Sequence, residues 1–313
     1  MQTYLGPAVV RLREWRQRWY ASPVLLVVTV AILAGLPDLL GVSVAGVSLG
    51  SVFSVHLLVV TLIWAIAAQG WNLVSGFAGQ FSFGHAAFFG LGAYAPLVLA
   101  GKFGINPWLG MLAGGAIAGL YALGIGVLTF RYEVRGSYFV LATLAFAELL
   151  LYIFINVEWL GGSSGFVKPL PSAYGAEFGL AAFQFRETLP YYYVGVALLV
   201  VVSVIALAVK RSGAGLYLFA IRDDEDAAGA VGIPTMRYKL LAFVASAFFT
   251  AWAGTLWSMY FTTIRPSVVF GVLVNLDVLL PAIVGGLGTV FGPILGSFVL
   301  TAVSEIGRTA VGL

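Results

Sequence analysis

Long apolar runs, separated by short polar connections, make up most of this 313-residue chain. Their lengths are close to the ~20 residues that an α-helix needs to cross ~30 Å of hydrocarbon. They lack the alternation of apolar and polar positions that marks the strands of a membrane barrel. The pattern predicts an all-α polytopic membrane protein with roughly eight to ten transmembrane helices. The predicted spans lie at about 23–40, 53–74, 77–100, 107–129, 137–157, 190–209, 239–260, 268–287 and 289–306.

Glycine and polar residues interrupt the span predicted at 77–100, and glycine and proline interrupt the region 268–306. Glycine lets a membrane helix break or approach a neighbour closely. Polar side chains are expensive in hydrocarbon and should face protein or water. We therefore predict a broken or re-entrant segment, whose polar side chains either line a translocation pathway or bond across tightly packed helices. These residues are Asn72, Ser75, Gln80, Ser82 and His85.

Composition strengthens the membrane interpretation. The chain is 61% hydrophobic and 9% charged, with a mean hydropathy of +1.00, whereas about a quarter of a soluble domain is charged. There is no cysteine, so disulfides and thiolate metal sites are excluded. No catalytic constellation and no metal-ligand spacing stands out, and we expect neither an enzyme nor a metal protein. The net charge of +3 is read as a sign of membrane orientation, not of nucleic-acid binding.

Lysine and arginine predict the orientation, because cytoplasmic connections carry an excess of both. A cytoplasmic N-terminus puts eleven basic residues inside and four outside, and the opposite orientation reverses this bias. The inside set is Arg11, Arg13, Arg16, Arg18, Arg131, Arg135, Lys210, Arg211, Arg222, Arg237 and Lys239, and the outside set is Lys102, Lys168, Arg186 and Arg265.

This orientation divides a single transmembrane domain, residues 1–313, into spans and three polar regions. Residues 1–22 form a basic cytoplasmic N-terminus, which with the apolar run after it is interpreted as an uncleaved anchor. Residues 158–189 form an external loop that contains "GGSSGF". Residues 210–238 form a cytoplasmic loop. We expect a multi-pass protein with contacts to membrane lipid.

The cytoplasmic loop contains the densest charge run of the chain, Asp223, Asp224, Glu225 and Asp226. Asp223 is a suitable N-cap, and an acid three residues later is typical of a capping box. Gly232 and Pro234 are typical of a helix end. The sequence thus predicts a short helix over 223–232, continued by Ala227, Ala228 and Ala230. The alternative is a solvated loop.

Two acidic residues, Glu148 and Asp277, fall inside predicted spans. Intramembrane acids mark ion pathways or interhelical bonds. They raise the possibility of a stand-alone, ion-coupled secondary transporter, with His85 as a further candidate. The other interpretation is that they are pathway or interhelical bonding groups of another kind of transporter.

Three segments carry a resemblance to a known family. "EDAAGAVGIP" (Glu225 to Pro234) resembles the EAA-type loop of ABC importer permeases. "WNLVSGFAGQFSFGHAAFFGLGAYA" (Trp71 to Ala95) and "LLPAIVGGLGTVFGPILGS" (Leu279 to Ser297) resemble the N- and C-terminal signatures of branched-chain amino acid permeases of the LivM type. Gly229 departs from the family pattern, where a longer residue is usual.

The resemblance implies a permease subunit of an ATP-driven, binding-protein-dependent importer in a bacterial inner membrane. Branched-chain amino acids are the expected substrates, and urea or short-chain amides are the alternative. It implies a coupling helix at 223–232 that contacts a cytoplasmic ATPase. It further implies a homologous permease partner, two ATPase chains and an external substrate-binding protein. ATP and Mg²⁺ would be used by the ATPase, and this chain has no P-loop sequence.

Overall fold

The computed structural model describes residues 21–39, 43–44, 47–48 and 54–311. The chain divides into two compact units, Met1–Ser51 and Val52–Leu313. Most of the predicted basic N-terminus, with its four arginines, lies outside the described residues. The first unit contains helix α2 (Ala21–Leu39) and a hairpin of β1 (Ser43–Val44) with β2 (Val47–Ser48). The apolar part of α2, Val24–Asp38, is shorter than a membrane-spanning helix.

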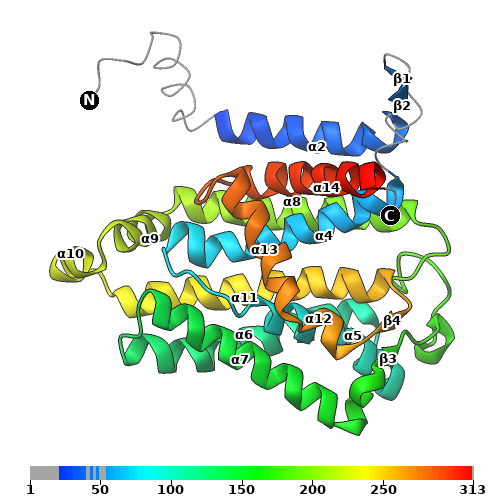
Figure 1. The fold of residues 1–313 in the computed structure, drawn as a ribbon, viewed down its shortest axis with the longest axis horizontal. Helices are drawn as coiled ribbons and strands as arrows, with labels where there is room; N and C mark the ends of the chain where they lie inside the picture. Colours follow the sequence, from blue (N-terminus) through cyan, green and yellow to red (C-terminus); the bar gives the residue numbers. More distant parts are fainter. Residues whose placement is uncertain (1–20, 40–42, 45–46, 49–53, 312–313) are drawn as a thin grey trace. The chain divides into compact units, whose positions relative to one another are not determined.

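The second unit is built almost entirely from apolar helices (Figure 1). Among the described residues, seven helical segments have the length and composition to cross a membrane, and Gly292–Gly307 is a shorter apolar helix. This confirms the predicted all-α polytopic fold. Six of the segments contain α4 (Val55–Trp71), α5 (His85–Phe103), α6 (Pro107–Arg131), α7 (Ser137–Asn156), α8 (Leu189–Arg211) and α11 (Thr235–Tyr260). The seventh combines α12 (Pro266–Val269) with α13 (Val272–Gly285), and the shorter apolar helix belongs to α14 (Gly292–Val311).

Helix α11 is the centre of this unit and packs against α4, α5 and α6. Glycine makes the packing possible, because a Cβ at Gly92 of α5 would lie 2.0 Å from the carbonyl oxygen of Ala251. A Cβ at Gly254 of α11 would lie equally close to the carbonyl oxygen of Phe89. The two backbones therefore touch, as small residues allow between membrane helices.

The predicted interruption follows α4. The helix continues as a π-helical segment, η1 (Asn72–Phe77), and residues 78–84 are not helical before α5 begins. The chain is thus broken in the glycine-rich segment, and its role as a re-entrant segment stays a prediction. Near the C-terminus, α13 crosses the other helices steeply and is followed by a tight turn into α14 (Figure 1).

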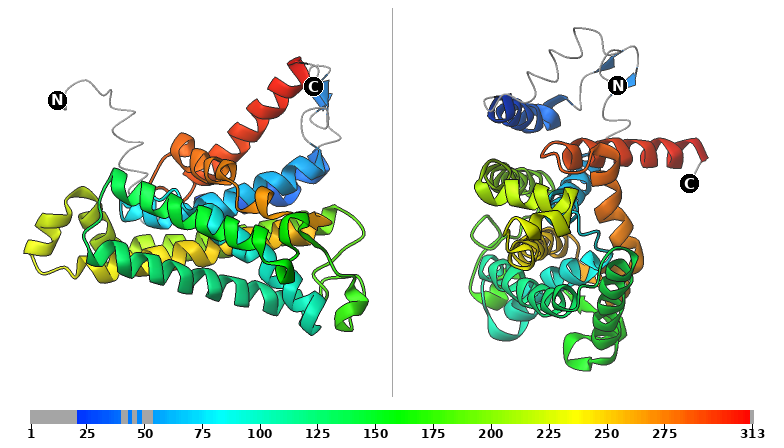
Figure 2. Two further views of the ribbon diagram at one scale, coloured as in Figure 1. Left: turned by 60° about the horizontal axis from the view of Figure 1, so that its bottom comes forward. Right: turned by 90° about the vertical axis from the view of Figure 1, so that its left-hand side faces the viewer.

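The second unit has two opposite ends. At one end lie α9 (Gly213–Asp223) and α10 (Glu225–Ala230), which project beyond the other helices (Figures 1 and 2). The basic residues at this end are Arg131, Arg135, Lys210, Arg211, Arg222, Arg237 and Lys239, whereas Lys102, Lys168, Arg186 and Arg265 belong to connections and helix ends at the other.

The connection at the other end is ordered by short elements. They are η2 (Glu158–Leu160), η3 (Gly162–Ser164), β3 (Phe166–Val167) and η4 (Pro171–Tyr174). Strand β3 pairs with β4 (Thr263–Ile264). This pairing attaches the connection to the segment that follows α11. Gly165 has φ +82°, and a Cβ there would lie 2.1 Å from the carbonyl oxygen of Ile264. The glycines of "GGSSGF" thus permit this pairing.

The region 210–238, predicted as a polar connection with one short helix, is more helical than expected. Helix α8 extends to Arg211, and α9 is an additional helix that the sequence analysis missed. A local signal for it exists, since Ser212 is its N-cap and accepts a hydrogen bond from the backbone N–H of Gly215.

Candidate functional site

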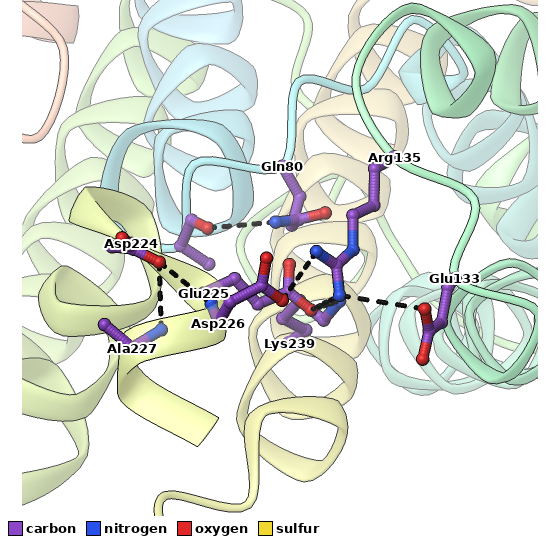
Figure 3. Close-up of polar contacts among 9 residues, drawn as sticks. Gln80, Glu133, Arg135, Asp224, Glu225, Asp226, Ala227 and Lys239 are labelled. Atoms are coloured by element: carbon purple, nitrogen blue, oxygen red, sulfur yellow. Dashed lines mark hydrogen bonds and ion pairs between the residues drawn. The ribbon is translucent and has the colours of Figure 1, made fainter. Parts of the chain in front are cut away.

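Helix α10 forms the tip of the projecting α9–α10 pair, and its start is fixed by Asp224. The Asp224 carboxylate accepts hydrogen bonds from the backbone N–H groups of Asp226 at 3.0 Å and Ala227 at 2.9 Å (Figure 3). The predicted N-cap, Asp223, is wrong, because Asp223 is the last residue of α9. The cap lies one residue later because α9 and α10 are consecutive helices that are separated by a single extended residue, Asp224.

The end of α10 is fixed by glycine, as predicted. Gly232 has φ +90°, and its N–H donates to the carbonyl oxygen of Gly229. The N–H of Ile233 donates to the carbonyl oxygen of Ala228 at 3.1 Å. These paired bonds define the Schellman motif, which needs a left-handed residue after the helix. The helix is therefore capped at both ends and is shorter than the predicted 223–232.

Helix α10 is anchored to α11 by an ion pair. Lys239 Nζ donates to Glu225 Oε1 at 2.5 Å, and the side chains are 3% and 15% exposed. Lys239 Nζ also lies 4.7 Å from the ring centroid of Phe130 on α6. A charge this buried needs a partner. Glu225 therefore pairs with Lys239 within its own chain, and its contact with an ATPase stays a prediction.

Arg135, in the connection between α6 and α7, adds a second contact. Its guanidinium lies 2.8 Å from the Asp226 carboxylate, 3.8 Å from Glu225 and 3.9 Å from Glu133 (Figure 3). The hydrogen bond from Arg135 to Asp226 raises the pKa of the arginine, and the charge of Glu225 adds to this shift. Because Arg135 and Asp226 are exposed, this pair orients α10 more than it stabilises it.

The exposed surface of α10 includes several small residues. Ala227, Gly229 and Ala230 are exposed, and Val231 after the helix is 80% exposed. Ala228, which was predicted with Ala227 and Ala230 as part of a helix that contacts an ATPase, is only 4% exposed and faces its own chain. Gly229 has no atom within 4 Å of where a Cβ would lie.

Arg222 links α9 to the broken segment after α4. Its Nη1 donates to the carbonyl oxygen of Gly76 at 2.7 Å, and its side chain lies against Gly79, where a Cβ would be 3.0 Å from Arg222 Cγ. The ring of Phe219, also on α9, lies 5.3 Å from that of Phe77. In the sequence, Arg222 stands out only as one of the basic residues that predict orientation.

The same region is joined to the α13–α14 turn. Asn72 accepts a hydrogen bond from the N–H of Gly288 at 2.9 Å and donates one to the carbonyl oxygen of Thr289 at 2.8 Å. Lys210 Nζ donates to the carbonyl oxygen of Gly288 at 3.1 Å. The ends of α8 and α9 therefore contact both glycine-rich turns of the unit.

The other polar residues of the broken segment bind its backbone. Ser75 Oγ donates to the carbonyl oxygen of Gln80, and Gln80 Nε2 donates to that of Ala78. Ser82 Oγ accepts from the N–H of Gly84. His85 Nε2 lies 2.7 Å from Ser246 Oγ on α11 and is buried. Ser75, Gln80 and Ser82 satisfy backbone groups that the break leaves without helical partners, whereas His85 bonds a side chain of α11. A pathway role for these residues stays a prediction.

The two intramembrane acids lie on different helices. Glu148 is half-buried on α7, and its Oε1 has no hydrogen-bond partner among the described residues. Asp277 is exposed on α13. Within the described part of the chain, no group of three or more His, Cys, Asp or Glu residues could hold a metal ion.

Sequence reasoning missed the three basic residues that hold α9 and α10, namely Arg135, Arg222 and Lys239. It counted them only as topogenic charges. The available signal was the run of four acids in a chain that is only 9% charged, because partly buried acids need basic partners. Which basic residues supply them depends on the packing of α6, α9 and α11.

The family described as "Branched-chain amino acid transport system / permease component" matches residues 53–313. The chain belongs to this family. The family resemblance seen in the three sequence segments is therefore confirmed. The match covers the second compact unit, including α9, α10 and both glycine-rich turns.

Named relatives support the assignment. The "High-affinity branched-chain amino acid transport system permease protein LivM" of Escherichia coli K12 is 29% identical over 275 residues, which are 82% of this chain and 64% of that protein. LivH of Salmonella typhimurium is 25% identical over 265 residues, 82% of this chain and 81% of that protein. BraD of Pseudomonas aeruginosa is 24% identical over 259 residues, 80% of this chain and 83% of that protein. The chain thus spans just under two thirds of the length of the E. coli LivM protein, and no solved structure matches it.

Proposed function

We propose that this permease takes up branched-chain amino acids and is driven by ATP hydrolysis on a separate partner chain, with α10 as the coupling helix. The observation that carries the proposal is the construction of α10. It is capped at both ends, projects from the unit and is anchored by Glu225 and Lys239. A rigid, exposed surface of Ala227, Gly229 and Ala230 allows close approach by another protein.

The orientation follows from charge. Of the twelve basic residues in the described second unit, seven gather at the end that carries α10, four lie at the other end, and Arg308 belongs to α14. The positive-inside rule makes the α10 end cytoplasmic, in a bacterial inner membrane. The cytoplasmic end is where ATP is available. A cytoplasmic N-terminus before α2 remains part of the proposal.

The partners follow from the same arrangement. We expect two ATPase chains, each engaging one permease at α10, and ATP and Mg²⁺ bound on those chains. We expect a homologous permease as the second membrane subunit, because LivM and LivH are different permease proteins that both resemble this chain. The connection between α7 and α8, at the opposite end, would receive an external binding protein.

The substrate proposal rests on the named relatives, which are branched-chain amino acid permeases. Urea or a short-chain amide is the alternative substrate. A second function, ion-coupled transport by this chain alone, is favoured only by the carboxylates of Asp277 and Glu148 in membrane-spanning helices. That function gives no reason for a capped and anchored α10 outside the spans.

The test is uptake by the purified complex in liposomes. We expect L-leucine uptake only with ATP inside and binding protein outside, and no uptake by this chain alone under a proton or sodium gradient. Uptake by the chain alone would replace the proposal with the ion-coupled function. Uptake of urea or acetamide without leucine would replace the substrate.

A further inference from the structure

Helices α4, α13 and α14 enclose a groove of about 330 Å³, which we call the α13–α14 groove. Its polar lining consists of two carboxylates, Asp277 and Glu305, and three hydroxyl groups, Ser297, Thr301 and Ser304. Trp64 of α4 and aliphatic side chains of the three helices complete it. An apolar wall beside a few convergent polar groups is the usual form of a small-molecule site.

The position of Asp277 argues that this groove does not face lipid. Asp277 is exposed and lies near the middle of the 20-residue span Pro266–Gly285. Its carboxylate has no hydrogen-bond or ion-pair partner among the described residues. A carboxylate at this depth faces water or a polar partner, because exposure to hydrocarbon is costly.

An exposed face that is wholly apolar looks different in the same chain. The exposed residues within the membrane part of α6 are apolar or glycine, including Leu109, Leu112, Ile117, Leu120 and Leu123. On α14, Leu295, Val299 and Val303 are likewise exposed and apolar, and none of them lines the groove. The polar residues are therefore confined to the groove, and the surface beside it remains apolar.

We propose that the α13–α14 groove is a water-filled part of the translocation route that binds the ammonium group of an amino acid substrate, with Asp277 and Glu305 supplying the negative charge. The hydroxyl groups accept or donate the remaining hydrogen bonds, and the apolar wall contacts an aliphatic side chain. A cleft lined by one sign of charge concentrates ions of the other sign.

This proposal rests on the proposed import function and selects between its two substrate classes. Urea and amides are uncharged and gain little from two carboxylates in a membrane. An amino acid brings a cation for Asp277, so the groove favours an amino acid over an amide.

The natural absence of cysteine allows a direct test by thiol accessibility. Ser304→Cys places a thiol in the groove, and Leu295→Cys, at a residue that is 62% exposed on the same helix but outside the groove, is the matched control. The purified complex in liposomes is treated with a cationic or an anionic water-soluble methanethiosulfonate, and mass spectrometry of the isolated permease gives the rates. Thr301→Cys provides a second groove position.

We expect Ser304→Cys to react about tenfold faster with the cationic than with the anionic reagent, because the carboxylates concentrate cations. Adding Asp277→Asn should reduce this preference, and Leu295→Cys should react with neither reagent. If both groove cysteines are unreactive, protein or lipid fills the groove and the inference is wrong. A charge preference that survives Asp277→Asn unchanged also contradicts it.

Ligand protection separates this inference from the proposed function. During ATP-driven turnover, L-leucine with its binding protein should slow modification of Ser304→Cys, and acetamide should not. If the wild-type complex transports leucine but leucine gives no protection, the groove is off the substrate route although the import function holds. If the wild-type complex shows no ATP-driven uptake, the import function itself fails.

Discussion

Lys239 and Glu225 join α10 to α11 through an ion pair of 2.5 Å in which the lysine side chain is only 3% exposed. The acids after Arg222 therefore have separate tasks. Asp224 caps the helix, Glu225 anchors it and Asp226 contacts Arg135. Asp223 closes the preceding helix. A charge run that looks uniform in the sequence thus builds one rigid element.

Breaking this ion pair should destabilise the permease. Glu225→Gln leaves the charge of Lys239 buried without its partner, which costs about 3 kcal/mol in comparable buried pairs. The measurement is thermal unfolding of the purified permease in detergent. The double variant Glu225→Gln with Lys239→Met should recover most of the loss, because no unpaired charge remains. Additive effects of the two substitutions would contradict this account.

The exposed pair of Arg135 and Asp226 is the matched control. Asp226→Asn should change the free energy of unfolding by less than about 1 kcal/mol, since exposed ion pairs contribute little. The residues are 41% and 79% exposed. A loss as large as that of Glu225→Gln would show that exposure does not govern the strength of these contacts.

Arg222 should couple α9 to the broken segment after α4. Replacing it by Gln removes the charged donor to the carbonyl oxygen of Gly76 and leaves α10 itself intact. We expect uptake per ATP hydrolysed to fall by about fivefold or more, the lower range of coupling between distant sites. The measurement compares uptake and ATPase activity in the same liposomes. Equal losses in both activities would indicate a purely structural role.

Gly229→Ala should stabilise α10. A Cβ at this position meets no atom within 4 Å, and alanine favours a helix over glycine by about 1 kcal/mol. Backbone hydrogen exchange over 225–231 should slow, while Ala230→Gly should speed it. Faster exchange in Gly229→Ala would show that the glycine is required for the conformation of this helix.

The two faces of α10 should respond differently to added bulk. Ala230→Trp changes the exposed face and should reduce ATPase association without lowering the unfolding temperature. Ala228→Trp introduces the same side chain at a buried position and should destabilise the permease, because packed interiors tolerate little added volume. Co-purification of the ATPase and thermal unfolding distinguish the two effects. Full association of Ala230→Trp would remove the exposed face from the proposed contact.

Local patterns in the sequence predicted much of this fold. Apolar run lengths located most of the spans to within a few residues, and glycine with polar residues located the break after α4. The span predicted at 77–100 begins only at His85, and those predicted at 23–40 and 289–306 correspond to shorter apolar helices. Gly232 located the end of α10. The N-cap was placed one residue early, at Asp223, because local propensity does not distinguish adjacent acids when a second helix precedes them. Helix α9 was missed because it borders a charge run within a polar connection.

The amino-acid sequence by itself determined the membrane class, the spans, the excess of basic residues at one end and the presence of a short, terminated helix, since each depends on residues near in the chain. Tertiary structure decided which charges meet. Lys239, Arg135 and Arg222 come from different segments, and only the packing of α6, α9 and α11 brings them to Glu225, Asp226 and Gly76. It also decided that Ala228 faces inward and that Asp277 lines a groove, because burial depends on neighbours distant in sequence.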